Sequence, residues 1–367
     1  MRITQVELYK LFIPLKEPFI ISLGPVYNAE NVLVVIRTSQ GITGYGECSP
    51  FMSINGESAD TGMVVGRYFA KVLIDKNPLL IEDHIAAMDK IIYGNSSIKS
   101  AFDIALYDIA SQQAASPLYK FLGGKKNKTI ITDYTVSIDE PGKMAADAVK
   151  IKNEGYPAIK IKLGKNGETD VLRIKAIREA VGDEIPLRID ANQGWDIEEA
   201  ITTLKSLAQF NIQHCEEPIP RWAFMQLSRI RKESPIPIMS DESCGDEHDA
   251  ERLIQLGACD YMNIKLGKSG GIFKALKMVK LAEAANIHLQ VGAFMESRLA
   301  MTAFAHFSLC SPAIVHYDFD TALMFSENPV SGGMIYKENG VIDVPDIPGL
   351  GAFVDEKWLG KMEKVTI

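Results

Sequence analysis

The sequence predicts an α/β protein in which repeated strand–helix units form a barrel, preceded by a smaller α+β domain. Short apolar segments between residues 158 and 265 each end in charged or polar residues. Lys162, Asp190, Glu216, Asp241 and Lys265 follow one another at intervals of 28, 26, 25 and 24 residues. A strand, a loop and an amphipathic helix together take about that length. Because strand ends of such a barrel meet at one face, these residues are expected to surround one pocket.

The composition limits the class of protein. A chain of 367 residues exceeds a usual single domain, so a large barrel plus a smaller domain accounts for it. The net charge of −8 and the absence of a basic stripe argue against nucleic acid and membranes as partners. No apolar run approaches the ~20 residues of a membrane span. With five cysteines in no paired spacing and no signal-peptide core, we expect a cytoplasmic protein with reduced thiols.

Residues 1–122 are expected to form the α+β domain. Alternating apolar residues predict strands over 3–13 and 31–38, and helical periodicity dominates from 78 to 121. Two segments rich in Gly, Pro and Ser, residues 14–28 and 49–59, are predicted as loops. Both carry apolar side chains, which is unusual unless the loops cover a binding site.

From residue 129 onward the strand–helix rhythm begins. Apolar runs that end in charged or polar residues span 158–162, 187–192, 212–218, 236–243 and 261–265, and each is predicted to contain a strand. Further strands are predicted over 130–136, 287–292 and 314–317. Helices are predicted over 141–154, 168–181, 197–210, 222–232, 246–256 and 271–285, with a further one through Cys310. The tail from residue 321 returns to loops and short strands, and we expect it to pack on the first domain.

Three carboxylates stand at consecutive strand ends, namely Asp190, Glu216 and Asp241. Converging without a cation, they would repel one another strongly. An all-oxygen set with room for water suits Mg²⁺, whereas zinc prefers His or Cys. A helix cap or surface residue is the better explanation for any one of them alone. Three acids in phase on adjacent strands favour a metal site.

Lysines flank these carboxylates on the second and sixth strands. Lys162 and Lys265 would face each other across the barrel mouth, which suggests proton removal on one side of a bound carbon and delivery on the other. A lone lysine is usually a surface residue, but an apolar strand that ends in Lys-Ile-Lys fits that explanation badly. Asp318 and Asp320 would share a strand-end face and could hold a cationic group, although a solvated turn explains them equally well.

In aggregate these motifs resemble the enolase superfamily, muconate-lactonizing subgroup. The resemblance is carried by Lys160-Ile161-Lys162, Asp190-Ala191-Asn192, Glu216-Glu217-Pro218, Asp241-Glu242-Ser243, Lys265 with Gly270-Gly271, and the linker-like segment from Asp103 to Gly124. It covers nearly the whole chain. It implies a modified (β/α)7β TIM-type barrel over residues 123–320, an α+β capping domain over 1–122, and a C-terminal segment, 321–367, that completes the cap.

The resemblance also implies a mechanism. In this family one Mg²⁺ ion per subunit chelates a substrate carboxylate while a base removes the adjacent α-proton, and the metal stabilises the enediolate. Carried over, Asp190, Glu216 and Asp241 bind the ion. Lys162 and Lys265 then exchange the proton on opposite faces of the α-carbon.

The particular reaction depends on Asp318 and Asp320, here called the aspartate doublet. Two lysines are shared by cycloisomerases, o-succinylbenzoate synthases, N-acylamino acid racemases and dipeptide epimerases. In dipeptide epimerases an Asp-x-Asp motif holds the free α-ammonium, so Asp318 and Asp320 favour epimerisation of the C-terminal residue of a dipeptide. Thr135, Lys160 and Met295 are expected to line the site. The alternatives are an N-acylamino acid racemase, an o-succinylbenzoate synthase, a muconate-type cycloisomerase and a non-catalytic barrel.

Specificity is expected to depend on the capping loops. Family members acting on Ala-Glu carry an arginine in the first loop, but residues 19–28 contain no basic residue. Apolar side chains stand there instead: Phe19, Ile20, Ile21, Leu23, Pro25 and Val26, joined by Ile54 from the second loop. The expected substrates therefore have an apolar C-terminal residue, as in Ala-Val or Ala-Leu. Four further residues complete the expectations: Asn192 and Glu242 in support of the site, and Arg298 and Lys268 as the cations able to restore acidic recognition. Assembly into a homo-oligomer is left open.

Overall fold

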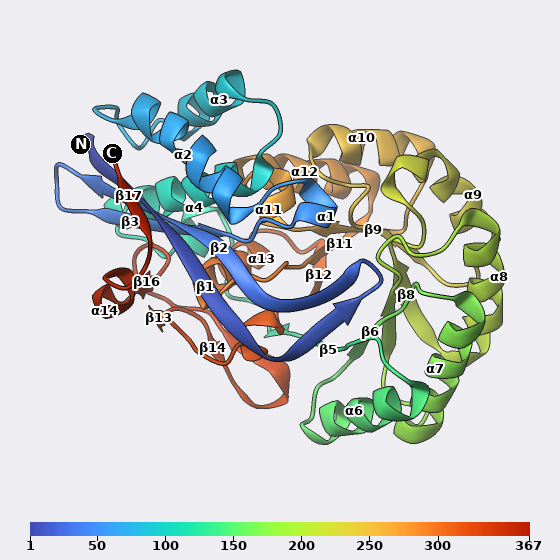
Figure 1. Cartoon of the computed structure of the whole chain (residues 1–367). Coiled ribbons are helices and arrows are strands. Elements are labelled where there is room, and N and C mark those ends of the chain that lie inside the picture. Colours follow the sequence, from blue (N-terminus) through green and yellow to red (C-terminus); the bar gives the residue numbers. More distant parts are fainter.

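The computed structural model describes residues 1–367 and shows a capping domain beside a barrel (Figure 1). The cap is built on an antiparallel sheet in the order β17-β1-β2-β3. Its strands are β1 (Ile3–Ile21), β2 (Gly24–Thr38), β3 (Thr43–Cys48) and β17 (Lys364–Thr366). Its helices are α1 (Met52–Asn55), α2 (Ala59–Leu73), α3 (Ile81–Ile91), α4 (Ser96–Gln113) and α5 (Leu118–Phe121). Because β17 pairs with β1, the two chain termini lie side by side.

The barrel is an eight-stranded parallel sheet in sequence order, with helices on its outer face. Its strands are β5 (Tyr134–Val136), β6 (Ile159–Lys162), β7 (Leu187–Asp190), β8 (Ile212–Glu216), β9 (Ile238–Ser240), β10 (Tyr261–Ile264), β11 (His288–Val291) and β12 (Ile314–Tyr317). The helices are α6 (Pro141–Asn153), α7 (Gly167–Val181), α8 (Ile197–Leu207), α9 (Leu227–Glu233), α10 (Glu247–Leu256), α11 (Leu266–Ser269), α12 (Ile272–Ala285) and α13 (Arg298–Ser308). A helix of seven residues or more follows every barrel strand except β12, so the predicted (β/α)7β pattern is confirmed. None of the helices has both the length and the apolar character needed to cross a membrane.

The tail forms small sheets at the junction of the cap and the barrel. They contain β13 (Val330–Gly332), β14 (Ile335–Tyr336), β15 (Val341–Asp343) and β16 (Ala352–Val354), followed by α14 (Glu356–Leu359). Short 3-10 helices lie at Thr321–Leu323 and Glu338–Gly340. Only the last strand, β17, enters the cap sheet, whereas β15 pairs with β4 (Ile130–Ile131). The domain boundaries at residues 122 and 320 stay a prediction.

The segment 14–28, predicted as a loop, is part of a long hairpin. After a register shift between Pro14 and Phe19, β1 and β2 continue to pair up to Ile21 and Gly24. Gly24 has φ of 124°, which glycine adopts readily, so it permits the tight turn. The expectation of a loop was wrong. The side chains of this segment do not alternate regularly between apolar and polar, so the sequence pattern did not indicate a strand, but hydrogen bonds between the two backbones form one. In Figure 1 the hairpin extends from the cap sheet across the barrel mouth.

Two predicted barrel elements are divided in the structure. The strand expected over 130–136 separates into β4 and β5, because Thr132 donates its N–H to Gly340 of the tail and not to a barrel strand. The helix expected over 222–232 begins as a 3-10 helix at Arg221–Gln226 before α9. A further 3-10 turn at Ala208–Phe210 ends α8. A hydrogen bond from Asp133 N to Tyr317 O, at 3.3 Å, links β5 to β12.

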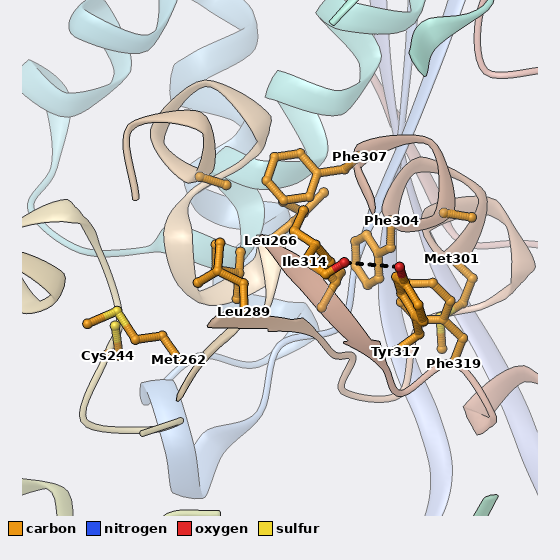
Figure 2. Packing of buried hydrophobic residues seen from close by; sticks show 14 of the residues in the cluster. Cys244, Met262, Leu266, Leu289, Met301, Phe304, Phe307, Ile314, Tyr317 and Phe319 are labelled. Atoms are coloured by element: carbon orange, nitrogen blue, oxygen red, sulfur yellow. Dashed lines mark hydrogen bonds between the residues drawn. The ribbon is translucent and has the colours of Figure 1, made fainter. Parts of the chain in front are cut away.

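The core between β12 and α13 fixes the direction of the aspartate doublet. Phe304 and Phe307 of α13 pack beside Ile314 and Tyr317 of β12, and Tyr317 Oη donates to Ile314 O at 3.0 Å (Figure 2). Phe319 joins this cluster and is fully buried. Since successive side chains of an extended segment point to opposite sides, the residues on either side of Phe319 are turned away from this core.

His306 links α13 to the cap and the tail, and its protonation should set part of the acid stability. Tyr119 N donates to its Nδ1 and its Nε2 donates to Leu350 O, both at 3.1 Å. Burial lowers the pKa of His306 to about 4. Histidine in the unfolded chain has a pKa of ~6.5, so as the pH falls the unfolded chain takes up this proton before the folded chain does. The stability contributed by neutral His306 is therefore complete above pH ~6.5 and is lost as the pH falls toward 4.

The free energy of unfolding should fall between pH 7 and pH 4.5 in both the wild type and His306→Gln. We expect the fall to be smaller in His306→Gln, by roughly 2–3 kcal/mol, because the variant has no imidazole to protonate. Urea unfolding at both pH values measures the difference. His248→Gln, the same substitution at an exposed histidine, is the matched control. Equal pH dependence in the wild type and His306→Gln would contradict the assignment.

Candidate active site

Three carboxylates converge at the ends of β7, β8 and β9. Parallel pairing places Lys162 beside Asp190 and Asp190 beside Glu216, while Asp241 directly follows β9. Ligand atoms of Asp190, Glu216 and Asp241 all lie within 4.8 Å of one another, and all three residues are fully buried. Adjacent strand ends thus bring residues far apart in the sequence into one cluster.

The chemistry of this cluster fits Mg²⁺. All three donors are carboxylates, the ligand type that a hard cation prefers, and no His or Cys belongs to the group. Two amides orient the Glu216 carboxylate, since Asn263 Nδ2 donates to Oε1 at 2.8 Å and Gln290 Nε2 donates to Oε2 at 3.2 Å. Such outer hydrogen bonds are typical of metal sites, where they fix the ligand geometry.

Four lysines surround the carboxylates, and they have different environments. Lys160 is fully enclosed by ion pairs with Glu216 at 2.8 Å and Asp318 at 2.7 Å. Burial works against its charge, but Asp318, Glu216 and Asp190 outweigh burial and raise the pKa of Lys160 well above its usual value. Lys160 is therefore held in an ion-pair network and, unlike Lys162 and Lys265, does not line the pocket.

The other pair, Lys162 and Lys265, lines the pocket. Lys162 Nζ contacts Asp190 at 2.6 Å and Lys265 Nζ contacts Asp241 at 2.7 Å. The strands β7, β8 and β9 separate β6 from β10 in the sheet order, so the two amino groups approach the pocket from opposite sides of the barrel. A substrate carbon between them would present one face to each lysine.

The pocket combines these polar groups with apolar side chains from the cap. It is lined by Phe19, Ile21, Val26, Phe51, Ile54, Thr135, Lys162, Asn192, Lys265, Ala293, Phe294, Met295, Asp318, Asp320 and Thr321. The structure thus brings together the residues predicted at the substrate, except Lys160, which lies in the ion-pair network beside it. Their roles stay a prediction.

Only part of the predicted apolar loop reaches the pocket. Phe19, Ile21 and Val26 line it, whereas Ile20, Leu23 and Pro25 do not. Because side chains alternate along the paired strands, Ile20 and its partner Pro25 point to the face of the hairpin away from the pocket. Leu23 lies in the turn. Sequence reasoning missed Phe294 as a lining residue, although it is next to the predicted Met295. Phe51 also lines the pocket, and it belongs to the second loop, which was expected to cover a binding site.

The supporting residues are also close to the site. Asn192 lines the pocket and donates its Nδ2 to Glu242 Oε1 at 3.2 Å. Ser22 Oγ of the hairpin donates to Asn192 O at 2.7 Å, so the hairpin tip is attached to the barrel there. Glu242 does not line the pocket, and burial together with Asp241 and Glu217 raises its pKa well above the usual value.

The two basic residues considered for acidic recognition are occupied elsewhere. Lys268 Nζ donates to the carboxylate and the backbone oxygen of Asp241 and to Asn263 O. Arg298 donates to Val330 O of the tail. Neither lines the pocket, where the only basic groups are Lys162 and Lys265, paired with Asp190 and Asp241. The cap surface of the pocket therefore offers no basic group to an acidic side chain.

Asp318 and Asp320 form the acidic side of the pocket. Lys160 and Lys162 oppose burial and hold the pKa of Asp318 below its usual value. Asp320 accepts from Thr135 N at 2.7 Å but has no lysine or arginine partner. Burial, together with Asp318 and Asp133, raises the pKa of Asp320 well above its usual value. A cationic group from a substrate would offset this repulsion.

A capped barrel whose strand ends bring three carboxylates and two lysines to one pocket is the architecture of the enolase superfamily. Residues 143–358 match the family model "Enolase C-terminal domain-like" and residues 3–123 match "Mandelate racemase / muconate lactonizing enzyme, N-terminal domain". The chain belongs to this mandelate racemase/muconate lactonizing enzyme family, as the resemblance of its motifs predicted.

Three relatives are informative. The chain is 59% identical to a D-Ala-D/L-Ala epimerase of Cytophaga hutchinsonii over all of both chains. It is 39% identical to a hydrophobic dipeptide epimerase of Enterococcus faecalis, over 96% of this chain and 99% of that protein. It is 34% identical to an N-succinyl-L-Arg/Lys racemase of Bacillus cereus, over 99% of this chain and 98% of that one.

Crystal structures of two of these relatives carry ligands. The Cytophaga hutchinsonii dipeptide epimerase, complexed with Mg and D-Ala-L-Val, superposes with a TM-score of 0.99 at 58% identity over 100% of both chains. The Enterococcus faecalis dipeptide epimerase, complexed with Mg and L-Leu-L-Tyr, gives a TM-score of 0.93 at 38% identity, over 96% of this chain and 99% of that one. Each of these peptides ends in a side chain without charge.

Proposed function

We infer that the protein is a Mg²⁺-dependent dipeptide epimerase that inverts the α-carbon of the C-terminal residue. One observation carries this inference: Lys162, Lys265, Asp318 and Asp320 line the same pocket, next to the carboxylate triad. The full-length similarity to dipeptide epimerases supports it. The pair of lysines supplies proton transfer, and the aspartate doublet supplies recognition of a free amino group.

The two lysines divide the proton transfer between them. One amine takes the α-proton from its face, and the ammonium of the other lysine delivers a proton to the opposite face, which inverts the carbon. Mg²⁺ held by Asp190, Glu216 and Asp241 would act as a Lewis acid on the substrate carboxylate. Lys160 stays paired with Glu216 and Asp318 and adds positive charge beside the carboxylate triad.

The aspartate doublet assigns the substrate a free α-ammonium. Asp320 has no cationic partner in the protein, and Thr135 N fixes its carboxylate in the pocket. An ammonium group would pair with it and with Asp318. A neutral N-acyl group would leave Asp320 buried next to another carboxylate without compensation. The N-succinyl-L-Arg/Lys racemase of Bacillus cereus makes N-acyl substrates the second candidate.

We expect Asp320→Asn to raise KM for Ala-Val about 10- to 100-fold, because the hydrogen bond from a charged ammonium is lost. The value of kcat should change less, since the lysines and the triad remain. Initial rates of epimerisation, followed by circular dichroism over a range of substrate concentrations, measure both constants. N-succinyl-Val serves as the control substrate, and a variant equally active on Ala-Val would shift the assignment to the N-acyl racemases.

The apolar wall indicates the side chain of the residue that is inverted. Phe19, Ile21, Val26 and Ile54 of the cap line the pocket, and no basic residue of the cap does so. We propose that dipeptides with an apolar C-terminal residue are preferred. Because such a pocket discriminates by only ~1–3 kcal/mol per methylene, several of them should be turned over.

Exchange of the α-proton tests the function directly. A dipeptide library incubated with the protein and Mg²⁺ in D₂O should incorporate deuterium into Ala-Val and Ala-Leu, with either D-Ala or L-Ala first, and mass spectrometry detects it. EDTA should stop the incorporation. Ala-Glu should exchange more slowly, and strong exchange of Ala-Glu alone would overturn the apolar preference. Exchange of N-acyl amino acids without any dipeptide would overturn the epimerase assignment.

A further inference from the structure

Three polar residues of the cap reach the barrel behind the pocket wall. Asn31 of β2 is 0% exposed and Glu47 of β3 is 1% exposed, while Ser49 directly follows β3 and is also buried. Asn31 Nδ2 donates to Glu47 Oε1 at 2.6 Å. None of the three lines the pocket, and the proton transfer described above does not use them.

These residues hold the backbone of the 293–297 loop, which connects β11 to α13. Met295 is fixed at both ends of its backbone, since its N–H donates to Ser49 Oγ at 3.2 Å and its carbonyl accepts from Asn31 Nδ2 at 2.8 Å. Glu47 accepts from Ser297 N at 2.9 Å and from Ser297 Oγ at 2.6 Å. It also accepts from Ala300 N at 3.2 Å. The buried carboxylate thus caps the first turn of α13, where unpaired N–H groups favour an anion.

The loop carries the aromatic ring that covers Lys265. Lys265 Nζ lies 4.8 Å from the centre of the Phe294 ring, which stacks on Phe51 with ring centres 5.9 Å apart. The face of an aromatic ring attracts an ammonium, so the ring biases the direction of the Lys265 side chain. The position of the loop therefore sets the position of the ring, which acts on Lys265 together with the ion pair to Asp241 at 2.7 Å.

Lys162 is covered by a different part of the chain. Its Nζ lies 5.9 Å from the centre of the Phe19 ring, which belongs to the hairpin. The hairpin tip is attached to the barrel through Ile20 and Ser22, at Ser137 and Asn192. None of these contacts involves Glu47 or Asn31, so the cap supports the two lysines through separate sets of hydrogen bonds.

We propose that Glu47, together with Asn31, is a positioning residue for Lys265. Its carboxylate receives all its hydrogen bonds from Asn31 and from the start of α13, and it has no lysine or arginine partner. Losing the carboxylate should loosen the 293–297 loop and slow proton transfer on the face of the α-carbon next to Lys265. Proton transfer on the face next to Lys162 should keep its rate. This inference rests on the proposed two-lysine function.

The test measures each face separately. Glu47→Gln keeps the shape of the side chain but removes the charge and part of the accepting capacity. With Mg²⁺ in D₂O, the two C-terminal epimers of Ala-Val are incubated in separate reactions, and initial α-proton exchange is followed by NMR. Because small displacements of a reacting group are costly, one epimer should lose about tenfold or more in exchange rate. The other epimer should change little. The affected epimer should be the one that Lys265→Met silences.

Asp108→Asn is the matched control. Asp108 is a buried carboxylate that accepts from Tyr45 N at 3.0 Å and Leu350 N at 2.7 Å, without contact to the 293–297 loop. This variant should leave the ratio of the two exchange rates at its wild-type value. Asn31→Ser provides a second variant, since it releases Met295 O and should change the ratio in the same direction, should Glu47→Gln fail to fold.

The outcomes separate the two proposals. Equal slowing of both epimers in Glu47→Gln and Asn31→Ser would show a purely structural role for Glu47 and overturn this inference. Selective slowing of the epimer that Lys265→Met silences, with wild-type far-ultraviolet circular dichroism, would support it, and selective slowing of the other epimer would overturn it. Absence of exchange in the wild-type protein with either epimer would instead overturn the proposed function.

Discussion

Replacing Lys265 by Met is expected to abolish epimerisation while one epimer of Ala-Val still exchanges its α-proton with solvent. In the variant, the epimer whose α-proton faces Lys162 can still lose it and regain a deuteron on the same side. The other epimer faces the substituted position and has no base within reach. Loss of a proton-transfer group costs about 10²–10⁴-fold, so inversion should fall at least that far.

Lys162→Met should give the mirror result, with exchange confined to the other epimer. NMR in D₂O follows exchange, and circular dichroism follows inversion, from each epimer separately. Lys160→Met is the matched control, because Lys160 lies two residues from Lys162 on β6 but is enclosed by Glu216 and Asp318. That variant should slow both epimers alike. If either Lys162→Met or Lys265→Met still inverts the carbon, the assignment of two bases is wrong.

Replacing Asp241 by Asn is expected to remove both Mg²⁺ binding and turnover. The change deletes one of the three carboxylates of the metal triad and leaves Lys265 and Lys268 facing a neutral amide. Lewis-acid stabilisation contributes several kcal/mol, so the rate of α-proton exchange should fall by about 10³-fold or more.

Mg²⁺ binding is measured independently of activity. A ligand that binds only the folded chain stabilises it, so Mg²⁺ should raise the melting temperature of the wild-type protein and leave that of Asp241→Asn unchanged. Isothermal titration calorimetry gives the affinity of each. Glu233→Gln, on the outer helix α9, is the control for removal of one negative charge. A variant that binds Mg²⁺ with wild-type affinity would contradict the assignment of Asp241 as a ligand.

Part of the site could be predicted because it depends on periodicity. The spacing of Asp190, Glu216 and Asp241 follows from the length of one strand–helix unit, and parallel strands then bring their ends together. The same phase relation placed Lys162 and Lys265 at one pocket. These predictions needed no knowledge of side-chain contacts, since strand alternation and barrel closure determine which residues meet.

Other features depend on contacts between distant segments, which no local pattern contains. The 14–28 segment forms a paired hairpin because β1 and β2 continue their hydrogen bonds past a bulge. Residues 130–131 leave the barrel because β15 of the tail pairs with them. Phe294 and Phe51 become neighbours only when the cap closes on the barrel.

The sequence by itself determined the class of fold, the family, the metal triad and the two lysines of this protein. These follow from residue types repeated at the period of a strand–helix unit, and the period fixes which strand ends become neighbours. The tertiary structure alone decided which face of the hairpin lines the pocket and that Lys268 and Arg298 are bound away from it. It also decided that Glu47 and Asn31 hold the loop beside Lys265. The reason is physical: hydrogen bonds between segments some 250 residues apart depend on the docking of the cap on the barrel, which leaves no periodic trace in the sequence.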